Sequence, residues 1–200
     1  DLGLPVSFPP FFHRYRSDAD RARWGDADPA LREGDVIHCD VGVQYLRLLT
    51  DHQELAYVLR PGETDAPEGL RLGMREANRL QDIFTGCWEQ GKTGNEILSA
   101  ALASARAEGI PNPRIYSHSL SHYLHEPGPL MGLPWEQECC PGRGDVPMEV
   151  GTAYTVELSV RVPVPEWGGQ EVSIPLEQDA ALTTEGVVYL DGRQTTFHLV

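Results

Sequence analysis

The sequence predicts a mixed α+β domain, with a β-hairpin first, helices next and several antiparallel strands last. Three observations support this order. Two apolar stretches near the start are joined by a tight connection, apolar residues in the middle recur at three- and four-residue spacing, and the last third alternates strand formers with turn residues. The 200 residues fit one domain, which would bury about two-thirds of its unfolded surface.

The elements are expected in the following order. Residues 1–34 are rich in Pro, Arg and Asp and are expected to be irregular. Residues 35–43 are predicted to form a buried strand and 46–59 its hairpin partner, with the turn centred near Tyr45. Apolar residues within 77–88 have helical spacing and predict the first helix.

A second helix is marked at both ends. Thr93 and Glu96 form a capping box at its start, and Gly109 with Pro111 ends it. A loop is predicted at 128–144. The final strands are predicted at 153–163, 170–182 and 187–200.

Composition excludes several classes of partner. The formal net charge is −14 with only 16 Lys plus Arg, which argues against binding to nucleic acid or to anionic membrane surfaces. The sequence contains neither a run of 18 apolar residues nor a recognisable signal peptide, and four cysteines are too few for a disulfide scaffold. We therefore expect a cytoplasmic protein. Because the first residue is Asp1 rather than Met, a processed or trimmed chain is also expected.

Two aspartates of the predicted hairpin are candidate metal ligands. Asp40 and Asp51 are eleven residues apart, and a turn near Tyr45 would place them opposite each other with Cβ atoms about 5 Å apart. Carboxylates that close repel each other unless a cation lies between them. The alternative is a different register with both side chains in solvent, although Asp40 ends an apolar strand, an unusual place for a solvated charge.

A histidine cluster and two later glutamates complete the candidate set. His118, His122 and His125 are three of the seven histidines, and imidazole is both a common metal ligand and a proton-transfer group. A solvated loop would also explain the cluster. Glu157 and Glu177 lie among strand formers, where a lone glutamate usually faces water. Together, four carboxylates and one imidazole suit a pair of divalent cations such as manganese, iron(II), cobalt or zinc.

The spacing of these residues resembles that of the pita-bread metallopeptidases, which include methionine aminopeptidase, aminopeptidase P, prolidase and the metal-free relative creatinase. The likeness covers roughly residues 31 to 190. The bacterial Xaa-Pro peptidase branch is the most similar, because of Thr50-Asp51-His-Gln and the run at 165–171. The matching motifs are Gly34-Asp35, Asp40-Val-Gly, Thr50-Asp51, His118 with His125-Glu126 seven residues later, and Glu177 with Thr183 and Gly186.

The resemblance implies a single catalytic domain over 1–200 with the pita-bread fold, a curved antiparallel sheet with helices packed outside, which lacks its first helices. It also implies two divalent cations, with manganese preferred and cobalt, zinc or iron as alternatives. Asp40 and Asp51 would hold one ion and His118 and Glu157 the other, with Asp51 and Glu177 shared. Glu157 would also move protons. His125 would stabilise the tetrahedral intermediate or bind the peptide oxygen, and His122 is a second substrate contact and the rival ligand.

The function implied is a dinuclear-metal-dependent peptidase that removes the N-terminal residue of short peptides, in particular at Xaa-Pro bonds, with a homodimer as a compatible assembly.

Three departures from the family pattern keep two alternative functions open. Serines replace the family's glycines at 117, 119 and 121, Leu158 replaces the proline after the fourth ligand, and Arg23 stands where a histidine is expected. The alternatives are a non-catalytic binding module and a creatinase-like hydrolase of C–N bonds in a small molecule.

Three other signals are interpreted structurally. Residues 86–93 match the pattern of a phosphate-binding loop, but the residues before them have helical rather than strand spacing. Cys39 alternates with Asp40, so it is predicted to face the opposite side of the strand and to lie in the core. His52 follows Asp51 and is likewise predicted to face away from the cations.

Overall fold

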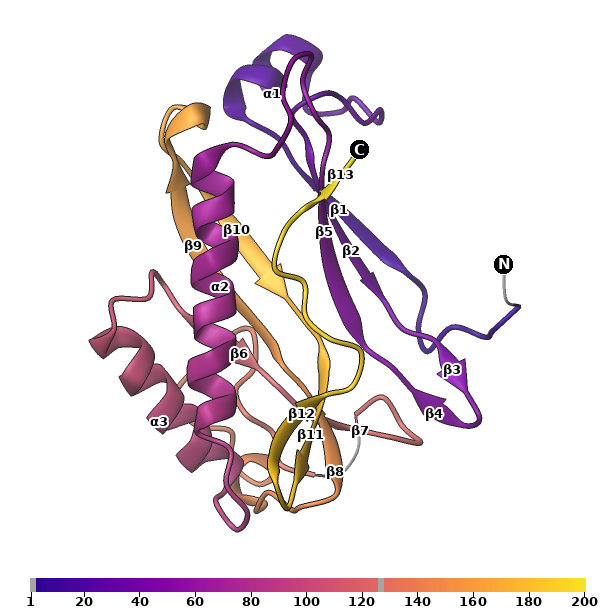
Figure 1. Cartoon of the computed structure of the whole chain (residues 1–200), viewed down its shortest axis with the longest axis vertical. Helices are drawn as coiled ribbons and strands as arrows, with labels where there is room; N and C mark the ends of the chain where they lie inside the picture. Colours follow the sequence, from indigo (N-terminus) through magenta and orange to yellow (C-terminus); the bar gives the residue numbers. More distant parts are fainter. Residues whose placement is uncertain (1–2, 126–127) are drawn as a thin grey trace.

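The first third of the chain forms a sheet around a long antiparallel hairpin, and a short C-terminal strand joins its edge in parallel (Figure 1). The computed structural model describes residues 3–125 and 128–200. The sheet has the order β1-β2-β5-β13, and the tip of the hairpin carries a short strand pair of its own, β3-β4. Its strands are β1 (Phe11–Tyr15), β2 (Val36–Val41), β3 (Gln44–Tyr45), β4 (Leu48–Leu49), β5 (His52–Tyr57) and β13 (His198–Leu199).

Residues 3–34 contain a strand and a helix, which corrects the prediction of an irregular segment. Strand β1 pairs with β2, and helix α1 (Asp18–Trp24) follows it. The side chain of Ser17 caps this helix by accepting a hydrogen bond from the backbone N–H of Asp20. Residues of β1 carry little periodic signal because their strand conformation depends on pairing with β2, a contact made through the tertiary fold.

The register of the hairpin also differs from the prediction. Asp40 is paired with Gln53 and not with Asp51, because the turn is formed by Leu46 and Arg47. Both turn residues have positive φ, 49° and 70°, although neither is Gly or Asn, so the sequence carried no turn signal at this place. Moving a turn by about one residue shifts the pairing by two, which keeps Asp40 and Asp51 on the same face.

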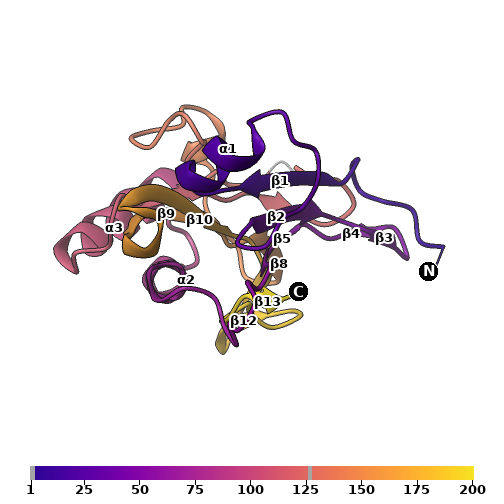
Figure 2. The same ribbon diagram turned by 90° about the horizontal axis from the view of Figure 1, so that it is seen from above.

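Both predicted helices are present, although the first begins at Glu68 and ends at Gly86 and so starts well before the spacing at 77–88 indicates. Helix α2 (Glu68–Gly86) buries one face against strands β9 and β10, and α3 (Gly94–Ala107) packs beside it (Figures 1 and 2). The capping box at Thr93 and Glu96 is present. Gly73 permits the close approach of α2 to the sheet, since a Cβ there would lie 2.7–2.8 Å from side-chain atoms of Val162 and Ile174.

The C-terminal strands are each interrupted where the sequence predicts continuous strands. Strand β8 (Thr152–Thr155) is separated from β9 (Glu157–Val164) by one residue, and β10 (Gln170–Leu176) from β11 (Asp179–Thr183) by two. Val156 N–H donates to Gln178 O across these breaks, over 2.7 Å. The remaining strands are β6 (Arg114–Tyr116), β7 (Ser119–Leu120) and β12 (Gly186–Tyr189), and short 3₁₀ turns occur at Arg143–Asp145 and Pro165–Trp167.

These interruptions divide the strands between two sheets. One has the order β10-β9-β6 and the other β12-β11-β8-β7, so three chain segments pass from the first sheet to the second. A single apolar core lies between α2, α3 and the strands and reaches Val36, Leu55 and Tyr57 of the first sheet. The fold is therefore the predicted mixed α+β class, with its helices on the outside of bent sheets (Figure 2).

Candidate metal centre

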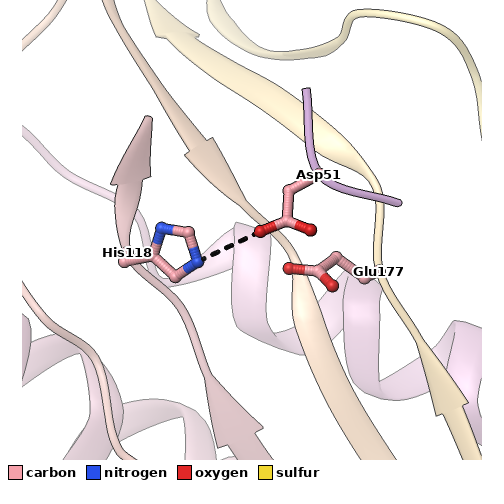
Figure 3. Close-up of side chains that lie close together, drawn as sticks. All are labelled: Asp51, His118 and Glu177. Atoms are coloured by element: carbon pink, nitrogen blue, oxygen red, sulfur yellow. Dashed lines mark ion pairs between the residues drawn. The ribbon is translucent and has the colours of Figure 1, made fainter. Parts of the chain in front are cut away.

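Three buried side chains from distant parts of the chain meet where the strands bend (Figure 3). Asp51, His118 and Glu177 each offer one ligand atom, and these atoms all lie within 4.8 Å of one another. The nearest pair is His118 Nε2 and Asp51 Oδ2, at 3.6 Å. Asp51 is 6% exposed and the other two are 1% exposed, so their polar atoms are withdrawn from water.

The two carboxylates are positioned by backbone bonds at the ends of strands. Asp51 directly precedes β5, and its N–H donates to Asp179 Oδ2 over 3.2 Å. Glu177 occupies the break between β10 and β11, and its carbonyl oxygen accepts from Gln53 N–H over 3.0 Å. The hairpin is thereby tied to the last strands at the position where both carboxylates emerge.

The imidazole of His118 lies in the break between β6 and β7. Its backbone oxygen accepts from Thr155 N–H over 2.9 Å, and its own N–H donates to Thr155 Oγ1 over 3.3 Å. Nδ1 lies 3.3 Å from the carbonyl oxygen of Ser119, which can only accept, so this nitrogen carries the proton. Nε2 is left as the lone-pair nitrogen toward Asp51, the state in which histidine binds a metal.

The serines that replace glycine around His118 have structural partners. Ser117 and Ser119 are 0% and 1% exposed. Ser117 Oγ donates to Thr155 O over 2.5 Å, and Ser119 Oγ accepts from the N–H of Gly128 over 3.0 Å. Both hydroxyls therefore fix the strand break that carries His118.

Two residues that the sequence did not single out connect the remaining glutamate to the cluster. Gln53 Nε2 donates to Glu157 Oε1 over 3.0 Å and to Glu177 Oε2 over 2.7 Å. His38 Nε2 lies 2.8 Å from Gln53 Oε1. Strand alternation could have placed both residues on this face, because His38 precedes Asp40 by two and Gln53 follows Asp51 by two.

The electrostatics of the centre fit a divalent cation. Burial, followed by the charge of Asp51, raises the pKa of Asp40 to about 6. Burial also raises the pKa of Glu157 and of Glu177 well above the usual range of a carboxyl group. Asp40 Oδ1 and Glu177 Oε1 are buried without a hydrogen-bond partner among the described residues. A cation would satisfy both oxygens and offset the repulsion between the carboxylates.

The two other histidines of the cluster have different surroundings. The ring of His125 is centred 4.3 Å from that of His118, tilted by 52°. Burial, and next the charge of His118, lower the pKa of His125, which favours a neutral ring. His122 is exposed, and its Nδ1 lies 3.2 Å from the carbonyl oxygen of Arg47 at the hairpin turn. Glu126, the acid of the predicted His-Glu pair, lies outside the described residues.

The predictions for Cys39 and His52 have different outcomes. His52 Nδ1 is 3.5 Å from Asp179 Oδ2, so this ring faces Asp179 and not the three-residue cluster, as strand alternation predicts. Cys39 is not in the core, which corrects the prediction. It is half-buried and is paired with Glu54, because the face of the first sheet opposite Asp40 is not covered by an apolar layer.

Strand β1 adds an aromatic wall to the face that carries Asp40. In the register of β1 and β2, Phe11 is paired with Asp40 and His13 with His38. The ring of Tyr15 is centred 4.6 Å from His13 and 6.4 Å from His38. His13 therefore brings an imidazole to this face, whereas Arg23, at the position where a histidine was expected, is on α1.

Two hollows adjoin the centre. A cavity of about 130 Å³ is lined by Gln53 and Glu157 together with the apolar groups of Ile115, Tyr116 and Pro134. A larger one, of about 850 Å³, includes in its lining Thr50 and Ser119, which neighbour Asp51 and His118 in sequence. Within residues 3–125 and 128–200, no helix combines the length and apolar character needed to cross a membrane.

The buried carboxylates and the imidazole that converge where the strands bend could hold a metal ion. The model of metallopeptidase family M24 matches residues 6–184, and the chain belongs to this family. The predicted family and its pita-bread fold are thus confirmed. No curated protein matches the sequence of this chain.

Solved structures of the same fold are distant in sequence. The X-Pro aminopeptidase from Thermotoga maritima MSB8 is 20% identical, with a TM-score of 0.69 over 98% of this chain and 50% of its own. The Xaa-Pro dipeptidase from Bacillus anthracis is 17% identical, with a TM-score of 0.67 over 98% and 49%. The N-terminal domain of the FACT complex subunit SPT16 from Cicer arietinum is 12% identical, with a TM-score of 0.62 over 96% and 44%. The chain spans about half the length of these structures or less.

Proposed function

We propose that this chain is the catalytic part of a metallopeptidase that removes the N-terminal residue of short peptides, at Xaa-Pro bonds in particular. The observation that carries the proposal is the buried cluster of Asp51, His118 and Glu177, with Asp40 and Glu157 beside it, in a chain of family M24. The preference for Xaa-Pro bonds is supported by the names of structures with the same fold. Cytoplasmic location and homodimer formation stay predictions from the sequence.

The five predicted ligands would hold two divalent cations. Asp40 and Asp51 would bind one ion and His118 and Glu157 the other, with Asp51 and Glu177 shared. The ions would act as Lewis acids toward the scissile carbonyl and the attacking water. Oxygen-rich ligation with one imidazole favours manganese, with cobalt, zinc or iron as alternatives.

Proton transfer is assigned to Glu157. Its carboxyl group is partly buried, accepts a hydrogen bond from Gln53 and borders the smaller cavity, where a reacting group could reach it. It would take a proton from the attacking water and deliver it to the leaving amine. His125, held neutral beside His118, would donate its ring N–H to the oxygen of the scissile carbonyl as negative charge develops there.

The smaller cavity is the proposed position of the proline ring. Its apolar lining, which includes Ile115, Tyr116 and Pro134, lies next to Glu157, the residue that would protonate the leaving nitrogen. A pyrrolidine ring in this cavity would place the proline nitrogen within hydrogen-bond reach of the Glu157 carboxyl group. Proton transfer to that nitrogen requires such contact.

The test is release of the first residue from Xaa-Pro dipeptides and tripeptides in the presence of Mn²⁺, with matched Xaa-Ala peptides for comparison. Faster release from the proline peptides is expected. Asp51→Ala should abolish release from both. The peptidase proposal fails if the wild-type chain, loaded with Mn²⁺, releases an N-terminal residue from none of these peptides.

A non-catalytic binding module is the second candidate. The observation that favours it is the likeness of the fold to the N-terminal domain of the FACT subunit SPT16, a protein that is part of a complex. Metal content discriminates between the two proposals. A folded chain that takes up less than one Mn²⁺ per molecule would support the binding module, because its carboxylates would then hold no catalytic ion.

A further inference from the structure

Three arginines from separate elements line one groove of about 620 Å³. They are Arg106 in the last turn of α3, Arg114 at the start of β6 and Arg161 in the middle of β9. All three are exposed, and none forms an ion pair or a side-chain hydrogen bond with any residue that the structure describes. In a chain with a net charge of −14, positive charge is thus concentrated here without an acidic partner from the protein.

This arginine groove adjoins the proposed position of the proline ring. It shares part of its lining with the cavity of about 130 Å³ beside Glu157. Four residues line both, namely Arg114, Gln137, Ser159 and Ser173. Strand β9 alternates between the two sides of its sheet, so Glu157 and Arg161 share one side, while Leu158 and Val160 face the core. The groove is therefore a continuation of the proposed active site.

The spacing of residues along β9 converts this arrangement into a peptide length. Arg161 follows Glu157 by four residues, which is about 13 Å at the rise of a β-strand. An extended peptide spans at most about 3.3–3.6 Å per residue. A substrate whose scissile bond lies at Glu157 and which extends along β9 therefore reaches Arg161 with the third or fourth residue after that bond. It passes Arg114 on the way, because Arg114 is paired with Ser159.

The charge of the groove is positive on the side that faces the first sheet. Burial raises the pKa of Tyr15 on β1, and the charge of Arg161 partly offsets this effect, so the guanidinium of Arg161 acts on a side chain of the first sheet. Glu171 is the one carboxylate in the lining, and it forms no ion pair with the arginines there. Three arginines and one glutamate leave an excess of two positive charges.

We propose that the arginine groove binds a carboxylate on the C-terminal side of the substrate, at the third or fourth residue after the scissile bond, and so selects peptides that carry negative charge there. This inference rests on the proposed peptidase function. A carboxylate is the expected ligand because it accepts parallel hydrogen bonds from the planar guanidinium group. It can come from an acidic side chain or from the free C-terminus of a short peptide.

The experiment compares matched peptides on the Mn²⁺-loaded chain. The first pair is Ala-Pro-Ala-Glu-Ala amide and Ala-Pro-Ala-Gln-Ala amide, which differ only in the charge of the third residue after the scissile bond. The Glu peptide should have a kcat/KM about 5-fold higher, through a lower KM, and the difference should shrink in about 0.5 M NaCl. The second pair is Ala-Pro-Ala-Ala as the free acid and as the amide. A preference confined to this pair would identify the C-terminus as the source of the carboxylate.

Two substitutions test the arginines themselves. Arg114→Gln and Arg161→Gln each remove one charge and keep a long polar side chain. Each should lower the ratio of kcat/KM between the Glu and Gln peptides toward 1, because one of the two guanidinium groups on the path of the substrate is lost. Arg161→Glu should reverse the preference, in favour of a peptide with Lys in place of Glu.

Arg75→Gln is the matched control. Arg75 is an exposed arginine of α2, and its partner Glu68 is exposed as well. Helix α2 packs against β9 and β10 on their core side, so this variant removes the same charge outside the groove. It should keep the wild-type ratio between the peptides and the wild-type response to salt. If a variant of the groove does not fold, the wild-type ratio and its response to salt decide.

Equal kcat/KM within both pairs of peptides in the wild-type chain would overturn the inference. A preference that survives in the double variant Arg114→Gln and Arg161→Gln would overturn it too. A chain that hydrolyses none of the peptides would reject the peptidase, and calorimetry with the same peptides would then decide on the groove. Tighter binding of the peptide with the carboxylate would uphold the inference, and equal binding would overturn it. The two proposals can therefore fail separately.

Discussion

The backbone N–H of Gln53 donates to the backbone oxygen of Glu177 over 3.0 Å, and this isolated bridge joins the first sheet to the last strands. The two residues are 124 positions apart in sequence. Asp51 lies two residues before Gln53, so the bridge also sets the separation between Asp51 and Glu177. The metal centre is consequently a product of long-range pairing and not of any one local motif.

The first prediction concerns Asp51, which the proposal shares between the two ions. Asp51→Asn keeps the shape of the side chain but removes its charge. In the wild-type chain this charge helps to raise the pKa of Asp40 and of Glu177. The metal-free variant should be at least as stable as the metal-free wild-type chain. Its kcat/KM for an Xaa-Pro peptide should fall by at least about 10³-fold, since the metal supplies several kcal/mol of stabilisation to the transition state. Thermal unfolding and peptide kinetics check the two parts.

The second prediction is that removal of metal destabilises the wild-type chain. A ligand present at 100 times its Kd stabilises by about 2.7 kcal/mol, which for a domain of this size corresponds to a Tm increase of about 5–10 °C. A chelator should reverse the shift, as followed by circular dichroism. Asp51→Asn should show little shift with Mn²⁺. An equal shift in that variant would mean that the ion binds elsewhere.

Local periodicity predicted the type of most elements but not their interruptions. Both helices were predicted from three- and four-residue spacing and from the capping box at Thr93. The breaks at Val156 and Gln178 were not, because strand-forming residues continue through both positions. The bend depends on which strand each residue pairs with, and that information lies in segments far along the chain.

The candidate site was likewise predicted from the sequence only in part. The sequence supplied the predicted ligands, and the structure brings Asp51, His118 and Glu177 within reach of one ion. It did not single out Gln53 or His38, because neither lies at a spacing that marks a metal ligand, although strand alternation places both on the face of Asp40 and Asp51. The full set of five ligands stays a prediction until a bound metal is measured.

The third prediction concerns a buried ion pair beneath the N-terminal segment. Arg16 is 1% exposed and Asp35 is 0% exposed, and Arg16 Nε and Nη2 each lie 2.7 Å from a different oxygen of Asp35. Arg16→Met leaves the carboxylate of Asp35 buried and uncompensated, which should cost about 3–5 kcal/mol of unfolding free energy. Urea denaturation measures the loss.

Arg71→Met is the matched control for Arg16. Arg71 pairs with Asp65 and Glu68, but all three side chains are substantially exposed. Exposed pairs contribute about 0–1 kcal/mol, so this variant should unfold at nearly the wild-type urea concentration. Equal losses for the two arginines would show that burial does not set the strength of the Arg16 pair.

The fourth prediction concerns stability at acid pH. The hydrogen bond from Arg32 lowers the pKa of Asp28, with further contributions from Ala30 N–H and Arg16 that outweigh the effect of burial. A carboxyl group whose pKa is depressed by folding stabilises the protein above its unfolded pKa, about 3.9, and this contribution is lost as the pH falls below that value. The wild-type chain should thus lose more stability than Asp28→Asn between pH 5 and pH 3, in matched thermal scans. Identical slopes would contradict the assignment.

The last prediction concerns the hairpin turn that sets the register of the metal centre. Leu46 and Arg47 both adopt positive φ, which costs on the order of 1 kcal/mol for a side chain other than Gly or Asn. Leu46 is 78% exposed, so its replacement loses no packing. The double substitution Leu46→Asn and Arg47→Gly should raise the unfolding free energy by about 1–2 kcal/mol. It should leave Mn²⁺ affinity unchanged, because the paired residues stay the same. Leu31→Asn, at an exposed leucine whose φ is not positive, should give no gain. A double variant that is less stable, or that binds Mn²⁺ differently, would show that the turn does not sit at these two residues.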